Sequence, residues 1–148
     1  MLKKLNYILA GIIIGISTSA FHPTAEEGIK LNITNLHNNK GYVLVSLFKN
    51  GEGYPNDPGK AFRKAKLAIQ DKKVTITFPG IPSASYAIAI LHDENDDQKM
   101  NKNFMGLPKE GYGFSNNATG VFGPPGYNKA SFRHTANTLT TIAIKTKY

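Results

Sequence analysis

The sequence predicts an all-β fold, a single antiparallel β-sandwich of about seven strands with one long ordered loop. Short segments of alternating or β-branched apolar residues recur along the chain, and clusters of glycine, proline and asparagine separate them. Short strands between turn signals are typical of a sandwich, and little or no helix is expected. The length of 148 residues suits one compact domain and is too small for two.

Strands are expected where apolar residues alternate with polar ones or where β-branched and aromatic residues cluster. Ile29, Leu31 and Ile33 alternate with polar residues, which predicts a half-buried strand. The segment 42–48 is β-branched and aromatic, which is typical of a central strand. Further strands are expected at residues 74–78, 86–91, 130–134 and 138–145.

The segment 60–69 permits two interpretations. A short helix could begin at Lys60 and end near Lys66, and a strand through Ala65, Leu67 and Ile69 is equally compatible with the pattern. Its basic residues could bind a polyanion, but a solvated face or an edge strand explains them more simply, because edge strands commonly carry lysine.

The first residues have the pattern of a secretory signal peptide. Lys3 and Lys4 precede an apolar run at 8–16, and small residues up to Ala20 provide a cleavage point. The alternative is an uncleaved N-terminal anchor. An exported protein would be periplasmic or extracellular, with no stable membrane insertion after cleavage. We therefore expect a signal peptide at 1–20, a lead-in at 21–28 and the sandwich domain at 29–148.

Charge and composition narrow the classes of partner. The chain has 18 basic and 10 acidic residues, and loss of Lys3 and Lys4 leaves 16 against 10, a net charge of +6. Charge of this size supports weak adhesion to anionic lipid or polysaccharide. Nucleic acid is not expected, because the basic residues are dispersed and the chain leaves the cytoplasm. The absence of cysteine excludes disulfides.

The stretch 93–128 is the most informative part of the sequence, because a loop of 36 residues is rare in a small domain unless it has a function or an ordering ligand. Near its start, oxygen-bearing residues recur at the spacing of a calcium loop. The turn glycine and the closing glutamate of such a loop are replaced by Gln98 and Phe104, and Glu110 is the nearest substitute carboxylate. The alternative is an acidic turn that caps its own backbone. The predicted Ca²⁺ ligands are Asp93, Asn95, Asp97, the carbonyl of Lys99, Asn101 and Glu110.

The second part of this stretch is rich in glycine and aromatic residues. Tyr112, Phe114 and Tyr127 could stack on a ligand, and Phe104 and Phe122 are further candidates. The alternative is that these rings fold inward and give the loop a small core of its own. The expected partner is an envelope glycan, a protein or a small ligand.

Three motifs carry a resemblance to a known family. HDEN at 92–95, KEGYGFSNN at 109–117 and FGPP at 122–125 resemble the bacterial exported proteins of domain of unknown function 2141. The resemblance implies an exported β-sandwich of immunoglobulin-like or prealbumin-like character and brings no activity. In the family pattern HDEN is followed by G-N-G-K-L-D-x-N. Here Asp96 and Gln98 replace the glycines and Asn101 replaces the aspartate.

We expect a protein that is not an enzyme. Cysteine is absent, and no nucleophile-elbow motif surrounds Ser115, which could otherwise combine with His92 and Asp93. The alternative is a small envelope carbohydrate hydrolase that uses Asp93 and Glu110 as its paired carboxylates.

Overall fold

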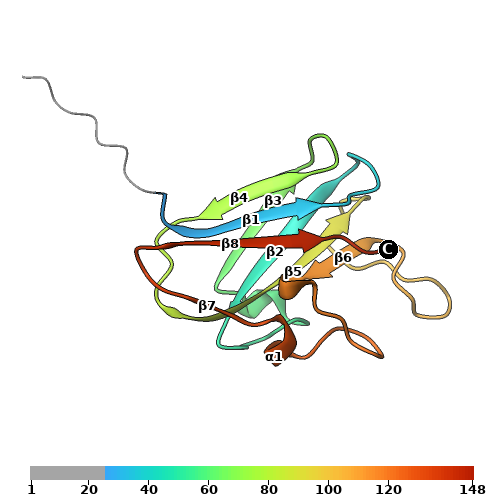
Figure 1. Ribbon diagram of the computed structural model, residues 1–148. Helices are drawn as coiled ribbons and strands as arrows, with labels where there is room; N and C mark the ends of the chain where they lie inside the picture. Colours follow the sequence, from blue (N-terminus) through green and yellow to red (C-terminus); the bar gives the residue numbers. More distant parts are fainter. Residues whose placement is uncertain (1–25) are drawn as a thin grey trace, which may run out of the picture.

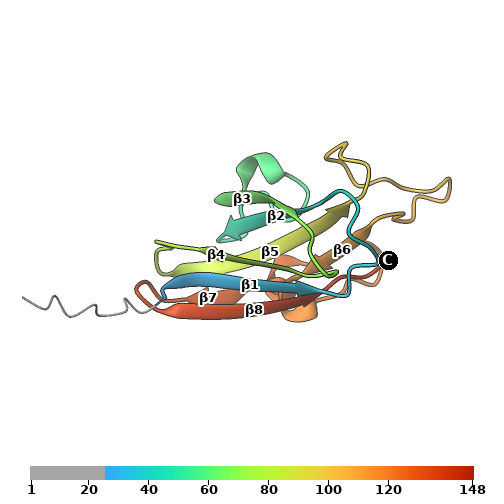
Figure 2. The same ribbon diagram turned by 90° about the horizontal axis from the view of Figure 1, so that it is seen from above.

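The computed structural model describes residues 26–148 as two β-sheets that pack face to face (Figures 1 and 2). The predicted signal peptide and most of the lead-in lie outside the described residues. The strands are β1 (Gly28–Thr34), β2 (Tyr42–Lys49), β3 (Arg63–Ala68), β4 (Val74–Phe78), β5 (Ala84–Asp93), β6 (Gly111–Phe114), β7 (Phe132–His134) and β8 (Leu139–Lys145). Short helical turns are η1 (Pro58–Lys60), η2 (Ser115–Asn117) and α1 (Tyr127–Ala130).

The smaller sheet has the order β4-β1-β8, and the larger has the order β3-β2-β5-β6 with β7 also paired to β5. This confirms the predicted all-β sandwich. The described residues form eight strands, and β1 pairs with β8 in parallel while the other pairs are antiparallel. The ambiguous segment 60–69 forms the edge strand β3, whose lysines are exposed. Lysine on an exposed edge discourages pairing with other chains.

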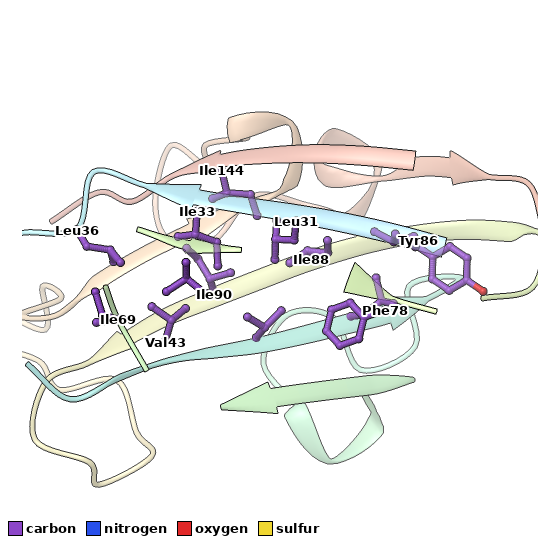
Figure 3. Packing of buried hydrophobic residues seen from close by; sticks show 14 of the residues in the cluster. Leu31, Ile33, Leu36, Val43, Ile69, Phe78, Tyr86, Ile88, Ile90 and Ile144 are labelled. Carbon is purple, nitrogen blue, oxygen red and sulfur yellow. The ribbon is translucent and has the colours of Figure 1, made fainter. Parts of the chain in front are cut away.

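The core lies between the two sheets and is built from the alternating residues that predicted the strands (Figure 3). Leu31 and Ile33 of β1 face Ile88 and Ile90 of β5, and all four are at most 4% exposed. Full burial of one such side chain contributes about 1.5–3 kcal/mol. The period of two therefore determines which face of each strand turns inward.

Strand β6 lies within the stretch 93–128 and divides that predicted loop. A short segment with two glycines has low strand propensity, so the sequence does not reveal it. A Cβ atom on Gly113 would lie 2.6 Å from Ile144 Cγ2, and one on Gly111 would lie 2.5 Å from the Tyr148 ring. Glycine at both positions lets β6 approach β8 and the C-terminal residues closely. Tertiary packing thus creates this strand.

A second, smaller cluster covers the other face of the larger sheet. It consists of Ala87, Phe114 and Ala130, with Tyr54, Tyr112 and Tyr127 packed around them. The Tyr54 hydroxyl is buried and has no hydrogen-bond partner among the described residues. Burial raises the pKa of Tyr54 from 10.0 to about 12, because the charged phenolate is poorly solvated there.

We predict that Tyr54→Phe stabilises the protein at neutral pH by up to about 1 kcal/mol, because it removes a buried hydroxyl without a partner. The raised pKa also makes stability fall as pH rises from 10.0 through about 12, since the unfolded chain ionises first. The variant should lose less stability over that range. Urea unfolding against pH measures both effects.

Tyr127→Phe is the matched control. Its hydroxyl donates to Ser85 Oγ at 3.0 Å, so its removal should destabilise the protein by about 1 kcal/mol. Equal losses in the two variants would contradict the assignment of Tyr54 as the unpartnered hydroxyl.

Candidate functional site

The 94–110 loop connects β5 to β6 and projects beyond the end of the sandwich that also holds the C-terminus (Figures 1 and 2). In the β5–β6 ladder His92 pairs with Gly111. Asp93 and Glu110 are the next residues outward on the two strands. The strand pairing therefore brings these two acidic residues together at the base of the loop.

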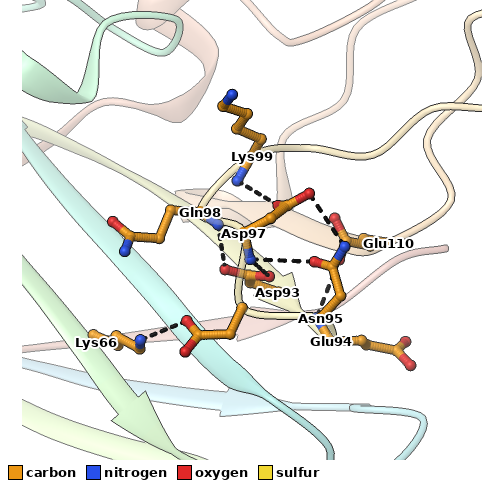
Figure 4. A network of polar contacts seen from close by, with 9 residues as sticks. Lys66, Asp93, Glu94, Asn95, Asp97, Gln98, Lys99 and Glu110 are labelled. Carbon is orange, nitrogen blue, oxygen red and sulfur yellow. Dashed lines mark hydrogen bonds and ion pairs between the residues drawn. The ribbon is translucent and has the colours of Figure 1, made fainter.

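Three carboxylates converge at this base. Asp93, Asp97 and Glu110 each place one oxygen so that the three atoms lie within 4.8 Å of one another. Asp93 is 0% exposed and Glu110 is 5% exposed, whereas Asp97 is open to solvent. Lys66 lies apart from these three carboxylates (Figure 4). Within residues 26–148 it forms an exposed ion pair with Asp96, which is not one of the three. The site is therefore rich in carboxylate oxygen, and the described residues place no lysine or arginine in an ion pair with it.

The two buried carboxylates also hold the backbone of the loop. Asp93 accepts hydrogen bonds from the backbone N–H groups of Asp97 at 3.2 Å and Gln98 at 2.8 Å. Glu110 accepts from the backbone N–H groups of Glu94 at 3.1 Å and Asn101 at 3.0 Å. Hydrogen bonds to a charged acceptor are stronger than neutral ones. Together they close residues 94–101 into a compact ring.

The Asp97 carboxylate accepts three further hydrogen bonds within this ring. Its Oδ2 accepts from the side-chain amides of Asn101 at 2.8 Å and Asn95 at 3.1 Å, and its Oδ1 accepts from the Lys99 backbone N–H at 2.9 Å. The Asn101 hydrogen bond, followed by that of Lys99, lowers the pKa of Asp97 below its ordinary value. Asp97 is therefore anionic at neutral pH.

The structure thus brings the predicted ligand set into one loop, with different roles for its members. The three carboxylates face one another, while Asn95 and Asn101 direct amide nitrogens to Asp97. Lys99, predicted to offer its carbonyl, contributes a backbone N–H to Asp97. These contacts contain the features of both predicted alternatives, the convergent carboxylates of an ion site and the hydrogen bonds of a self-capped turn.

The backbone at Asp96 and Gln98 is unusual. Their φ angles are +61° and +60°, in the left-handed region that glycine adopts most readily. These are the two positions at which the family resemblance implies glycine. The loop therefore holds two residues with side chains in a backbone conformation that favours glycine.

The aromatic residues of the stretch fall into two groups. Phe114 is 8% exposed, and Tyr112 and Tyr127 are half-buried in the cluster on the outer face of the larger sheet. Phe104 and Phe122, in contrast, are 97% and 99% exposed. The rings predicted to contact a ligand therefore contribute to packing, and two others project into solvent.

The polar residues considered for catalysis form hydrogen bonds within the fold. Ser115 is fully buried, where its Oγ accepts from the Ile88 N–H at 2.9 Å and donates to the Ala130 carbonyl. His92 is fully buried too, with Nε2 2.9 Å from the Lys40 carbonyl and Nδ1 2.6 Å from the Tyr148 hydroxyl. In the neutral imidazole, the hydrogen bond to the carbonyl places the proton on Nε2, and Nδ1 then accepts from the Tyr148 hydroxyl.

We predict that Gln98→Gly stabilises the protein by roughly 0.5–1 kcal/mol, because glycine adopts the positive φ without steric cost. Lys99→Gly is the matched control. Its φ is outside the positive range, so glycine there should destabilise the protein by roughly 0.5–1 kcal/mol. Urea unfolding measures both, and destabilisation by Gln98→Gly would contradict the strained backbone.

The helical turns found within residues 26–148 are all too short to span a bilayer. Comparison with curated proteins and with solved structures found no match. Comparison with protein families matched residues 31–142 to "Uncharacterized protein conserved in bacteria (DUF2141)", which covers all eight strands in whole or in part. The chain therefore belongs to the DUF2141 family of bacterial proteins.

Proposed function

We propose that this protein is a non-enzymatic, exported β-sandwich of the bacterial envelope whose 94–110 loop binds Ca²⁺ together with Asp93. The observation that carries the proposal is the convergence of three carboxylates, two of them buried, without a lysine or arginine partner in the described chain. Buried carboxylates are costly unless they are paired or coordinate a metal. The predicted signal peptide and the net positive charge support the envelope location.

The chemistry of the donors favours calcium over other ions. Ca²⁺ takes six to eight oxygen ligands in a flexible geometry. Asp93, Asp97 and Glu110 supply carboxylate oxygens, and rotation of the Asn95 and Asn101 amides would exchange nitrogen for oxygen. The group contains no cysteine or histidine, the ligands that structural zinc prefers.

Calcium would order the loop as a surface for a partner. The cation would offset the repulsion between three carboxylates and fix the ring of residues 94–101 on the β5–β6 ladder. The partner remains an envelope glycan, a protein or a small ligand. Tyr112 of β6 and Tyr127 of α1 are half-buried in the cluster on the outer face of the larger sheet, and they are the predicted ligand-contacting rings that stay partly accessible.

The competing proposal is a carbohydrate hydrolase that uses Asp93 and Glu110. In such enzymes the two carboxyl groups flank the glycosidic bond, about 5 Å or more apart. Here both residues are buried, and all four carboxylate oxygens accept backbone N–H groups. Burial and these hydrogen bonds disfavour a glycosidic bond placed between the two carboxyl groups.

We predict that millimolar Ca²⁺ raises the thermal unfolding midpoint relative to EDTA. At a concentration about 100 times the dissociation constant, the gain is about 2.7 kcal/mol, or on the order of 10 °C. The chain from Phe21 onward suffices, because the eight strands lie within residues 26–148. Asp97→Asn should abolish most of the shift, since it removes one of the three charges.

Asp96→Asn is the matched control. Asp96 is exposed, adjacent to Asp97 and bound to Lys66 rather than to the group, so this variant should keep the full calcium shift. If Ca²⁺ does not raise the unfolding midpoint of the unsubstituted protein, the ion site is refuted and these residues serve only to cap their own turn. Hydrolysis of an envelope glycan that Glu110→Gln abolishes while folding is retained would support the hydrolase instead.

A further inference from the structure

The tip of the 94–110 loop has a structure of its own, an apolar hairpin formed by residues 101–109. Lys102 and Pro108 form a β-bridge, and the Lys109 N–H donates to the Asn101 carbonyl at 2.8 Å. The Asn103 N–H donates to the Leu107 carbonyl at 2.8 Å. The hairpin therefore has paired arms rather than an irregular path.

The turn of this hairpin is closed by Asn103. Its carbonyl accepts from the Gly106 N–H at 2.9 Å, and its side-chain Oδ1 accepts from the N–H groups of Met105 at 2.9 Å and Leu107 at 3.0 Å. Gly106 has a φ of +78°, which a tight turn requires and glycine permits. These bonds satisfy most backbone N–H groups at the tip, a condition for any segment that enters an apolar medium.

The hairpin presents its apolar side chains outward. The exposed fractions of Phe104, Met105 and Leu107 are 97%, 65% and 55%, so none of these side chains packs against the sandwich. Figures 1 and 2 show the loop standing clear of both sheets at the end of the molecule. Contiguous exposed apolar side chains are typical of interaction sites, and the bordering charges distinguish this hairpin from the exposed pair Val121 and Phe122.

The charges around the tip indicate what it meets. Lys99, Lys102 and Lys109 are exposed, and the segment 99–109 contains no acidic residue. Apolar residues bordered by lysine are the composition of segments that insert into the interface of an anionic membrane. Lysine can place its ammonium group at the phosphates while its methylene chain follows the apolar residues inward.

We propose that the apolar hairpin is a peripheral docking site for an anionic lipid surface. Phe104 and Met105 enter the interface between headgroups and acyl chains, and Lys102 and Lys109 contact the lipid phosphates. The contact is shallow and reversible, because a few side chains bury little area and no described helix spans a bilayer. The sandwich itself remains outside the membrane.

The acidic base of the loop modulates this contact. Asp93, Asp97 and Glu110 lie on the same loop and repel anionic lipid, so Ca²⁺ bound there would strengthen docking. This dependence rests on the proposed ion site, whereas docking itself does not. None of the three carboxylates lies within 101–109, so the two proposals can fail separately.

The test exploits the absence of tryptophan from the chain. Phe104→Trp places a single fluorophore at the tip, in the protein from Phe21 onward. With vesicles of phosphatidylcholine and phosphatidylglycerol, its emission should shift to the blue and be quenched by brominated lipid. The shift should weaken with added salt, because the lysine contacts are electrostatic. The titration is run in EDTA and in Ca²⁺.

Phe122→Trp is the matched control, because Phe122 is equally exposed but its segment 119–126 has no charged residue. It should show little or no shift. In vesicle sedimentation, Phe104→Ser with Met105→Ser should lower binding by about ten-fold or more. Lys102→Gln and Lys109→Gln should each lower it by roughly five-fold.

Three outcomes would overturn the proposal. The first is an unchanged emission of Phe104→Trp with anionic vesicles in both EDTA and Ca²⁺. The second is a loss of specificity. A shift on pure phosphatidylcholine equal to that on anionic vesicles would show that the lysines have no role, and an equal shift in Phe122→Trp would show that the hairpin has none. The third is a blue shift that depends on protein concentration without vesicles, which would assign the tip to contact between two copies of the chain. Docking that is identical in EDTA and Ca²⁺ would uphold the hairpin and refute only its coupling to the ion.

Discussion

The pairing of β5 with β6 is the constraint on which the candidate site depends. Its register places His92 opposite Gly111 and therefore brings Asp93 and Glu110 together where the ladder ends. From this position the two buried carboxylates accept four backbone N–H groups and shape residues 94–101. Because Asp93 ends β5 and Glu110 directly precedes β6, the pairing of these strands sets the relative positions of the two carboxylates.

The residues that carry the family resemblance have identifiable structural roles. Gly111 and Gly113 let β6 approach the C-terminal strand, and Ser115 joins β5 to the segment around Ala130. Asn117 accepts from the Lys145 N–H at 2.8 Å and so fastens η2 to β8. A signature that determines a fold says little about activity, which explains why the motifs identify the family without identifying a reaction.

The long connection separates into two chemically distinct parts. Its base is acidic, partly buried and held by hydrogen bonds to carboxylates, whereas its tip is apolar, basic and exposed. Hydrogen bonds from Asn101 and Lys109 link the two parts, because Asn101 contacts both Glu110 and the arm of the hairpin. If the proposed ion binds, these hydrogen bonds are the link through which a change of charge at the base would reach the tip.

The sequence by itself determined the all-β class, most strand positions and the clustering of acidic residues, because alternation and composition are local properties. It identified Asp93, Asp97 and Glu110 as members of one group, and the structure brings them together. Only the tertiary structure decided that β6 exists, that β1 and β8 are parallel, and that Phe114 packs into the cluster on the outer face of the larger sheet while Phe104 lies in solvent. These features depend on which distant strands pair and in what register. The sequence around a single aromatic residue does not reveal whether that residue will be buried or exposed.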